Sequence, residues 1–202
     1  RDYKVTGVQT CALPICKPGL LFGYLFFGFW LWNILSTFWV ANTAYVAGML
    51  ANSVNAALMT LPWVVFHLLT FNKRNPGKYI LLAGLWIMFE YLHSNWDISW
   101  PWLTLGNGMA TCYPFIQWYE YTGYFGGSVW IWAINILVGL AWMEKSKLRT
   151  YATATGIILI VPITLSLLLY FGYKEKGVAV DVTVVQPNYE PHYQKFNIPE
   201  EM

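Results

Sequence analysis

Two ionisable residues lie inside an apolar segment of the chain, in the stretch WIMFEYLH, where Glu90 is followed by His93. Positions i and i+3 share one face of a helix, so this carboxylate and imidazole could form a charge-assisted hydrogen bond. Ionisable groups are costly in lipid and usually have a function there. The pair is a candidate for direct substrate binding or for fixing helix packing, and the sequence leaves both possibilities open.

A tryptophan-rich stretch follows this pair, with the sequence NWDISWPWLTLGNG; we call these residues, 95–108, the PW loop. Trp100 and Trp102 flank Pro101, a combination that makes a rigid amphipathic platform suited to the headgroup level of a bilayer. Gly106 and Gly108 allow tight backbone turns. An aromatic belt explains the loop without further assumptions, and a place at a binding site is the alternative.

Few other side chains suggest chemistry. Glu120 begins an apolar segment, where solvation explains its charge, and His67 within a segment is typical of a packed helix residue. Cys112 has no histidine or carboxylate near it in sequence to activate a thiolate. The three cysteines lack metal-ligand spacing, and the chain carries no phosphate loop, dinucleotide fingerprint or HExxH motif. We therefore predict no metal site and no cofactor.

The composition is that of a membrane protein. Hydrophobic residues make up 57% of the chain, aromatic residues 19% and charged residues only 11%, against roughly 25% charged in a soluble domain. A soluble globule of 202 residues could not bury so much apolar surface. The formal net charge of +2 is too small to suggest nucleic acid as a partner.

Five apolar segments approach or exceed the length of about 20 residues that crosses a hydrocarbon core. They are residues 19–40, 45–71, 79–92, 115–142 and 151–173. The third is short and reaches crossing length only if residues 93–96 lie in the interface. We predict an all-α polytopic membrane domain with about five transmembrane helices over residues 17–173.

The charges in the connecting loops predict an orientation. Basic residues occur in the loop between the second and third segments and in the loop between the fourth and fifth: Lys73, Arg74, Lys78, Lys145, Lys147 and Arg149. Residues 41–44 and 93–114, on the other side, contain no Lys or Arg. Basic loops stay in the cytoplasm, so we predict that everything after Tyr173 lies outside.

The chain changes character after residue 173. Residues 178–185 form a β-branched run between Gly177 and Pro187, which is typical of a buried strand. A single strand has no partner for its backbone hydrogen bonds. We therefore predict that residues 174–202 begin an α/β domain whose remainder lies beyond Met202.

Five stretches, taken in order, resemble one family. They are GFWLWNILSTFWV, LWIMFEYLH, WPWLTLGN, PFIQWYEYTGYFGGSVWIWAINILV and VTVVQPNYEPHYQKF. The chain is similar to the apolipoprotein N-acyltransferases of the bacterial inner membrane. The resemblance implies a membrane domain followed by an extracytoplasmic nitrilase-like domain, of which residues 174–202 would be the truncated start.

The resemblance also implies a reaction. An acyl chain passes from a phospholipid to a cysteine, forming a thioester, and then to the N-terminal diacylglyceryl-cysteine of an apolipoprotein. The implied partners are this phospholipid donor, the apolipoprotein acceptor and the bilayer. The family's Glu, Lys and Cys triad would lie beyond Met202, so no catalytic residue is expected here and Cys112 is not the nucleophile.

The resemblance carries substrate-binding roles to a few positions. Trp100, Pro101 and Trp102 match the family's loop, which favours a place near the lipid over a plain aromatic belt. Glu90 matches a family glutamate, whereas His93 stands where arginine is common. Phe196 falls where many members have tryptophan, so an aromatic side chain is kept.

Two other classes of protein remain open at this stage. A non-enzymatic transporter or anchor module would use Glu90 and Glu120 to line a polar path. A membrane-anchored carbon-nitrogen hydrolase would use the same nitrilase-like fold on amides. The residues after Met202 would discriminate among the three, because an acyltransferase needs Glu, Lys and Cys in that order.

The first 16 residues match neither the predicted membrane domain nor the family that the rest of the chain resembles. The stretch VTGVQTCALPI lacks the continuous apolar centre of an export signal, and it corresponds to one reading frame of a common short-read sequencing adapter. We predict that residues 1–16 are an adapter artefact. On that interpretation the chain is a fragment, and Cys112 is its only trustworthy cysteine.

Overall fold

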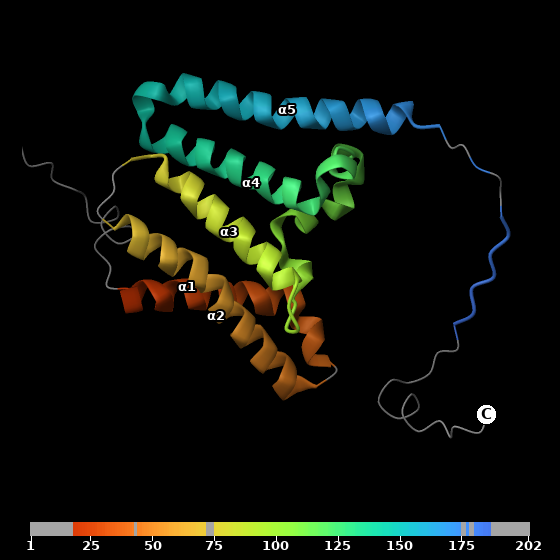
Figure 1. The fold of residues 1–202 in the computed structure, drawn as a ribbon, viewed down its shortest axis with the longest axis horizontal. Helices are drawn as coiled ribbons and strands as arrows, with labels where there is room; N and C mark the ends of the chain where they lie inside the picture. Colours follow the sequence, from red (N-terminus) through yellow and green to blue (C-terminus); the bar gives the residue numbers. More distant parts are fainter. Residues whose placement is uncertain (1–17, 43, 72–74, 175–176, 178–179, 187–202) are drawn as a thin grey trace, which may run out of the picture. The chain divides into compact units, whose positions relative to one another are not determined.

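In the computed structural model, the residues described are 18–42, 44–71, 75–174, 177 and 180–186. The described residues up to Gly172 form one compact unit and those from Tyr173 belong to another, so each is treated separately. In its described part the first unit consists of five α-helices and four 3₁₀ segments (Figure 1). The helices are α1 (Pro18–Thr37), α2 (Tyr45–Thr70), α3 (Lys78–Ser94), α4 (Tyr119–Met143) and α5 (Leu148–Gly172). The 3₁₀ segments are η1 (Phe38–Asn42), η2 (Pro101–Leu103), η3 (Leu105–Phe115) and η4 (Lys145–Lys147).

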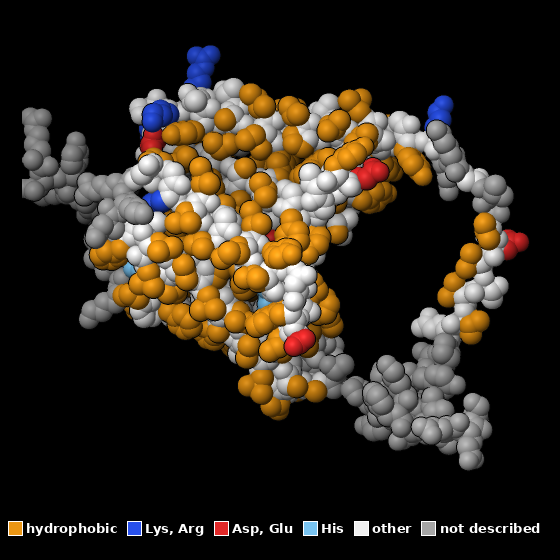
Figure 2. All heavy atoms as spheres, viewed as in Figure 1, with side chains coloured by type: hydrophobic (Ala, Val, Ile, Leu, Met, Phe, Trp, Pro, Cys, Tyr) orange, Lys and Arg blue, Asp and Glu red, His pale blue; other side chains and the backbone are white. Residues whose placement is uncertain are grey.

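The first unit buries polar side chains and exposes large apolar ones. Among the described residues, the largest fully buried side chains are all polar: Asn33, Thr37, Asn52, Thr60, Ser128 and Ser166. Hydrophobic side chains cover much of the face shown in Figure 2. Helices in lipid associate through small and polar residues, because lipid offers no hydrophobic drive between them. This distribution is that of a helical membrane domain.

Four helical segments are long and apolar enough to cross a membrane: Pro18–Asn42, Tyr45–Thr70, Tyr119–Met143 and Lys145–Gly172. The predicted all-α membrane domain is therefore confirmed for four of its five segments. The third helix, α3, has 17 residues, which at 1.5 Å per residue is slightly shorter than a hydrocarbon core of about 30 Å. It packs against both α2 and α4, and its crossing remains a prediction.

The long helices alternate in direction, so that the connecting loops fall at two ends of the unit (Figure 1). The start of α3 and the turn between α4 and α5 lie at one end, and the PW loop lies at the other. The described basic residues of the first unit belong to the former end: Lys78, Lys145, Lys147 and Arg149. Lys73 and Arg74 are outside the described residues. The placement agrees with the charge pattern of the loops.

The fourth helix begins later than the sequence predicted. Residues from 115 were expected to be helical, but Phe115 ends η3 and α4 begins at Tyr119. Within its first turns, Gly123 has a φ of 65°, a left-handed conformation that glycine adopts readily. The kink separates a short first turn from the long helix that follows, which explains the misplaced boundary.

The described residues of the second unit contain no strand. Residues 180–186 have no regular secondary structure, and Val180, Val182, Val184 and Val185 are exposed. The predicted strand is not formed within the described residues 180–186, and a strand would need a neighbour for its backbone hydrogen bonds. Phe196 lies outside the described residues, as do residues 1–16.

Candidate functional site

Glu90 connects α3 to the PW loop. Its side chain is only 3% exposed, and Oε1 accepts a hydrogen bond of 2.9 Å from Trp86 Nε1, one turn earlier on α3. The same oxygen accepts a bond of 2.8 Å from the backbone N–H of Leu105. A carboxylate with two N–H donors is well compensated for burial. Glu90 therefore holds the end of the loop against the helix.

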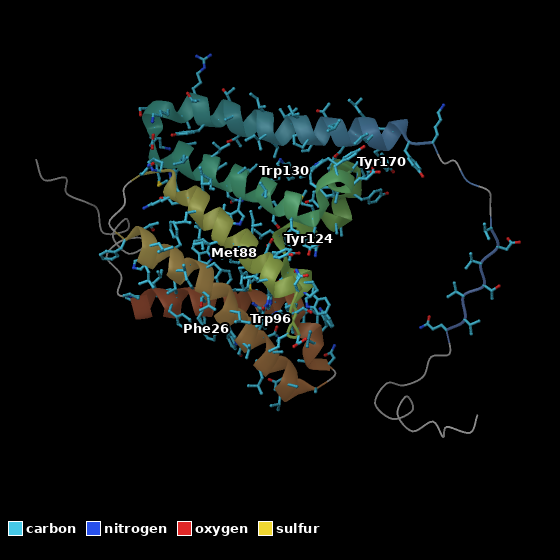
Figure 3. All side chains as sticks on the ribbon, viewed as in Figure 1. Phe26, Met88, Trp96, Tyr124, Trp130 and Tyr170 are labelled. Carbon is cyan, nitrogen blue, oxygen red and sulfur yellow. The ribbon has the colours of Figure 1, made fainter. Side chains whose placement is uncertain are left out.

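The PW loop is also docked on α4. The backbone N–H of Gly106 donates to Ser128 Oγ over 3.0 Å, and the carbonyl of Gly106 accepts from the Tyr119 hydroxyl over 3.2 Å. A Cβ on Gly106 would collide with the carbonyl oxygen of Tyr124, so only glycine allows this approach. Figure 3 shows Tyr124 at the start of α4, beside the loop.

His93 does not pair with Glu90. Its Nε2 lies 2.8 Å from Asn55 Oδ1 on α2, while the partners of Glu90 are Trp86 and Leu105. The unbonded atoms Glu90 Oε2 and His93 Nδ1 are buried without a partner among the described residues. The i, i+3 spacing placed both groups on one helix face, but neighbouring elements supply each with a different partner. The sequence left this pairing open, and the structure gives the two side chains different partners.

Trp100 and Trp102 form part of an aromatic edge around the loop. Their rings are 5.8 Å apart in an edge-on contact, and Trp102 makes a second edge-on contact of 6.0 Å with Trp39 of η1. Trp102 is exposed, with 50% of its surface accessible, and Trp100 is less exposed than Trp102. The Pro101 carbonyl accepts from Thr104 Oγ1 and Asn107 Nδ2, each over 3.0 Å, which closes the turn that carries both tryptophans.

Trp100 borders two cavities. The first, which we call the polar cavity because Asn55, Glu90 and His93 border it, has a volume of ≈ 10 Å³. Its other lining residues are Met59, Trp86, Phe89, Trp100, Leu103 and Thr104. The second, the apolar slot, has a volume of ≈ 210 Å³ and is walled by aliphatic residues of α2 and the loop: Leu50, Ala51, Val54, Leu58 and Ile98. Asn55, His93 and Trp100 border both. The site thus combines an apolar recess with a small cavity that shares Asn55, His93 and Trp100 with it.

The other candidate residues lie apart from this site. Glu120 is exposed at the start of α4, as solvation of its charge requires. His67 is buried on α2 with its ring against Phe71. Cys112 is a free cysteine in η3. Groups of three or more metal-ligating side chains are absent from the part of the chain that the structure describes.

Three residues of the site were not predicted from the sequence: Trp86, Asn55 and Asn33, which bonds Asn55. Asn33 and Asn55 are both buried within otherwise apolar helices. Polar residues inside membrane helices face the interior of the bundle, and that rule would have singled them out. No sequence signal links Trp86 to Glu90 beyond their i, i+4 spacing.

These features define a polytopic α-helical membrane protein whose tryptophan-rich loop closes a polar cavity beside an apolar slot. The family profile described as the apolipoprotein N-acyltransferase N-terminal domain matches residues 11–137, which is more than half of the chain. The chain belongs to the apolipoprotein N-acyltransferase family.

A curated relative supports this assignment. The apolipoprotein N-acyltransferase of Chlorobaculum tepidum is 31% identical over 172 residues, which cover 80% of this chain and 31% of that protein. The chain thus spans 31% of the length of this relative. No solved structure matches the chain.

Proposed function

We propose that this chain supplies part of the membrane domain of a phospholipid:apolipoprotein N-acyltransferase. The whole enzyme would move an acyl chain from a phospholipid to a cysteine, with loss of the lysophospholipid and formation of a thioester. The α-amino group of an N-terminal diacylglyceryl-cysteine would then attack the thioester and release the thiol. Its Glu, Lys and Cys triad would lie beyond Met202, in a nitrilase-like domain that begins within residues 174–202.

The observation that carries this proposal, beyond family membership, is the apolar slot of ≈ 210 Å³, whose lining includes His93 and Trp100. An acyl chain is apolar and gains free energy from an apolar recess, whereas its ester end needs polar neighbours. Ile98 and Trp100 of the PW loop line the slot, and this loop lies at the end of the unit opposite the basic loops. We propose that the slot receives part of the acyl donor, with Trp100, Pro101 and Trp102 bordering lipid access.

Glu90 and His93 have a supporting place in this proposal. Glu90 bonds the backbone of the loop, and the polar cavity beside it is too small for a phospholipid headgroup. We therefore propose that Glu90 positions the loop, and that His93, which borders the slot, forms part of its wall. Phe196 is proposed as an aromatic contact for the substrate, on family resemblance alone.

The activity is tested with the full-length protein, a phospholipid and a diacylglyceryl-cysteine peptide. The peptide is expected to gain one acyl chain on its α-amino group, measured by mass spectrometry, with a cysteine thioester on the enzyme as the intermediate. A transporter or anchor module would leave both reactants unchanged. A carbon-nitrogen hydrolase would instead cleave an amide substrate, and either result would refute the proposed function.

Filling the slot tests its role separately. Ala51→Phe places a large ring in the slot and is expected to lower acyl-enzyme formation at least tenfold, about 1.4 kcal/mol, because the ring competes with the acyl chain. Ala47→Phe, one turn earlier on α2, adds the same ring at an exposed position outside the slot. Both variants are compared at equal amounts of folded enzyme. Equal activities of the two would contradict a role of the slot in donor binding.

The proposed location is the bacterial inner membrane, with the PW loop and the residues after Tyr173 on the periplasmic side. A thiol reagent that cannot cross the membrane is expected to label Gly108→Cys, which is exposed in the PW loop, and to miss Asn75→Cys near the start of α3. Peptide-level mass spectrometry on intact cells scores each site separately from Cys112. Labelling of Asn75→Cys without labelling of Gly108→Cys would refute this orientation.

A further inference from the structure

A chain of hydrogen bonds crosses three helices and ends on His93. Asn33 Nδ2 donates to the backbone carbonyl of Phe29 over 2.8 Å, within α1. Asn55 Nδ2 of α2 donates to Asn33 Oδ1 over 2.6 Å, and Asn55 Oδ1 lies 2.8 Å from His93 Nε2 of α3. The chain is buried along its length, with Asn33 0%, Asn55 3% and His93 8% exposed.

The first of these hydrogen bonds, from Asn33 to the Phe29 carbonyl, fixes which atom donates in each of the others. A backbone carbonyl only accepts hydrogen bonds, so the amide nitrogen of Asn33 must face Phe29 and its oxygen must face Asn55. Asn55 must then present its nitrogen to Asn33 and its oxygen to His93. An oxygen facing Nε2 requires a proton on Nε2. Neutral His93 is therefore the Nε2–H tautomer, and its Nδ1 carries a lone pair.

The lone pair of His93 Nδ1 is one of three unsatisfied polar groups at the polar cavity. Glu90 Oε2 and Trp100 Nε1 are the others, and all three atoms are buried without a hydrogen-bond partner among the described residues. Their residues border the same cavity of ≈ 10 Å³. Buried polar atoms are rarely left unpaired, because desolvation without a compensating bond is costly.

We propose that the polar cavity binds a single water molecule that bridges Glu90, His93 and Trp100. The volume is about that of one water-sized probe, and a buried water typically makes about three hydrogen bonds. Water accepts from the Trp100 N–H, donates to His93 Nδ1, and serves Glu90 Oε2 whether this oxygen is ionised or protonated. An ammonium group could not accept the bond from Trp100, and a headgroup would not fit the cavity.

The water would connect α3 to the PW loop at a second point, beyond the bond from Leu105 to Glu90. It would hold the indole of Trp100 between the polar cavity and the apolar slot, both of which this residue borders. Asn55 is then a positioning residue, because it sets the tautomer that turns an acceptor toward the water. This site does not depend on the proposed acyltransferase activity.

The test is solid-state NMR on the full-length protein in lipid vesicles, with the histidine rings labelled with ¹⁵N. We expect His93 to show a protonated Nε2 and a bare Nδ1, with magnetisation transfer from water protons to Nδ1. Its signals are assigned by difference against His93→Gln. If that variant does not fold, a second sample with ¹³C,¹⁵N-histidine and carbonyl-¹³C leucine assigns them by correlation with the Leu92 carbonyl. A proton on Nδ1, or transfer from lipid protons in place of water protons, would overturn the proposal.

A pair of asparagine variants tests the positioning role. Asn55→Leu removes the acceptor from His93 Nε2 and is expected to give a mixture of both tautomers. Asn135→Leu is the matched control. Asn135 of α4 donates to the Ile131 carbonyl and does not belong to the series of hydrogen bonds that ends on His93. A similar change in both variants would refute a specific role of Asn55. The measurement on the wild type tests whether the polar cavity holds water, even if Asn55→Leu fails to fold.

Discussion

Gly106→Ala is expected to release the PW loop from α4 and to lower the stability of the full-length enzyme. The added Cβ would meet the carbonyl oxygen of Tyr124, and overpacking of this kind costs roughly 1–3 kcal/mol. Moving the loop away would also break the bonds of Gly106 to Ser128 and Tyr119, at about 1 kcal/mol each. The midpoint of thermal unfolding in detergent and limited proteolysis of the loop measure the change.

The matched control is Gly108→Ala, two residues later in the same loop. A Cβ at Gly108 has no atom within 4 Å, so this substitution is expected to leave the unfolding midpoint and the cleavage rate nearly unchanged. Equal losses in the two variants would mean that any side chain in this turn is harmful. Such a result would contradict the close contact between the loop and α4 as the cause.

The helices were predictable because lipid imposes a simple requirement on sequence. A spanning segment must satisfy its backbone internally and expose apolar side chains, and both demands are local. The kink at Gly123 was not predictable from hydropathy, since the apolar character continues on both sides of it. The predicted strand is absent from the described residues 180–186 for a different reason, because a strand depends on a neighbour that the described residues do not provide.

The residues of the candidate site were only partly predictable. Glu90, His93 and Trp100 stood out by type, and the structure brings them to one cavity. Their bonds were not predictable, because Asn55 is 38 positions from His93 and Leu105 is 15 positions from Glu90. Such contacts depend on how helices pack, and several polar partners compete for each group. A spacing rule within one helix cannot decide that competition.

Glu90→Ala is expected to have the largest effect in the site. It removes the acceptor of two hydrogen bonds, from Trp86 Nε1 and the Leu105 N–H. Each buried donor left unpaired costs about 1–3 kcal/mol, so the loss is roughly 2–6 kcal/mol in total. Acyl-enzyme formation per folded molecule should also fall, because the PW loop loses its link to α3. Thermal unfolding and thioester formation in the full-length enzyme measure the two effects.

Two further glutamate variants identify the cause. Glu90→Gln keeps an oxygen that can accept both bonds, so its stability should lie near that of the wild type and well above that of Glu90→Ala. Glu120→Ala removes an exposed carboxylate from the start of α4 and should change stability little. If Glu90→Gln were as damaging as Glu90→Ala, the negative charge, and not the two accepted bonds, would be what the loop requires.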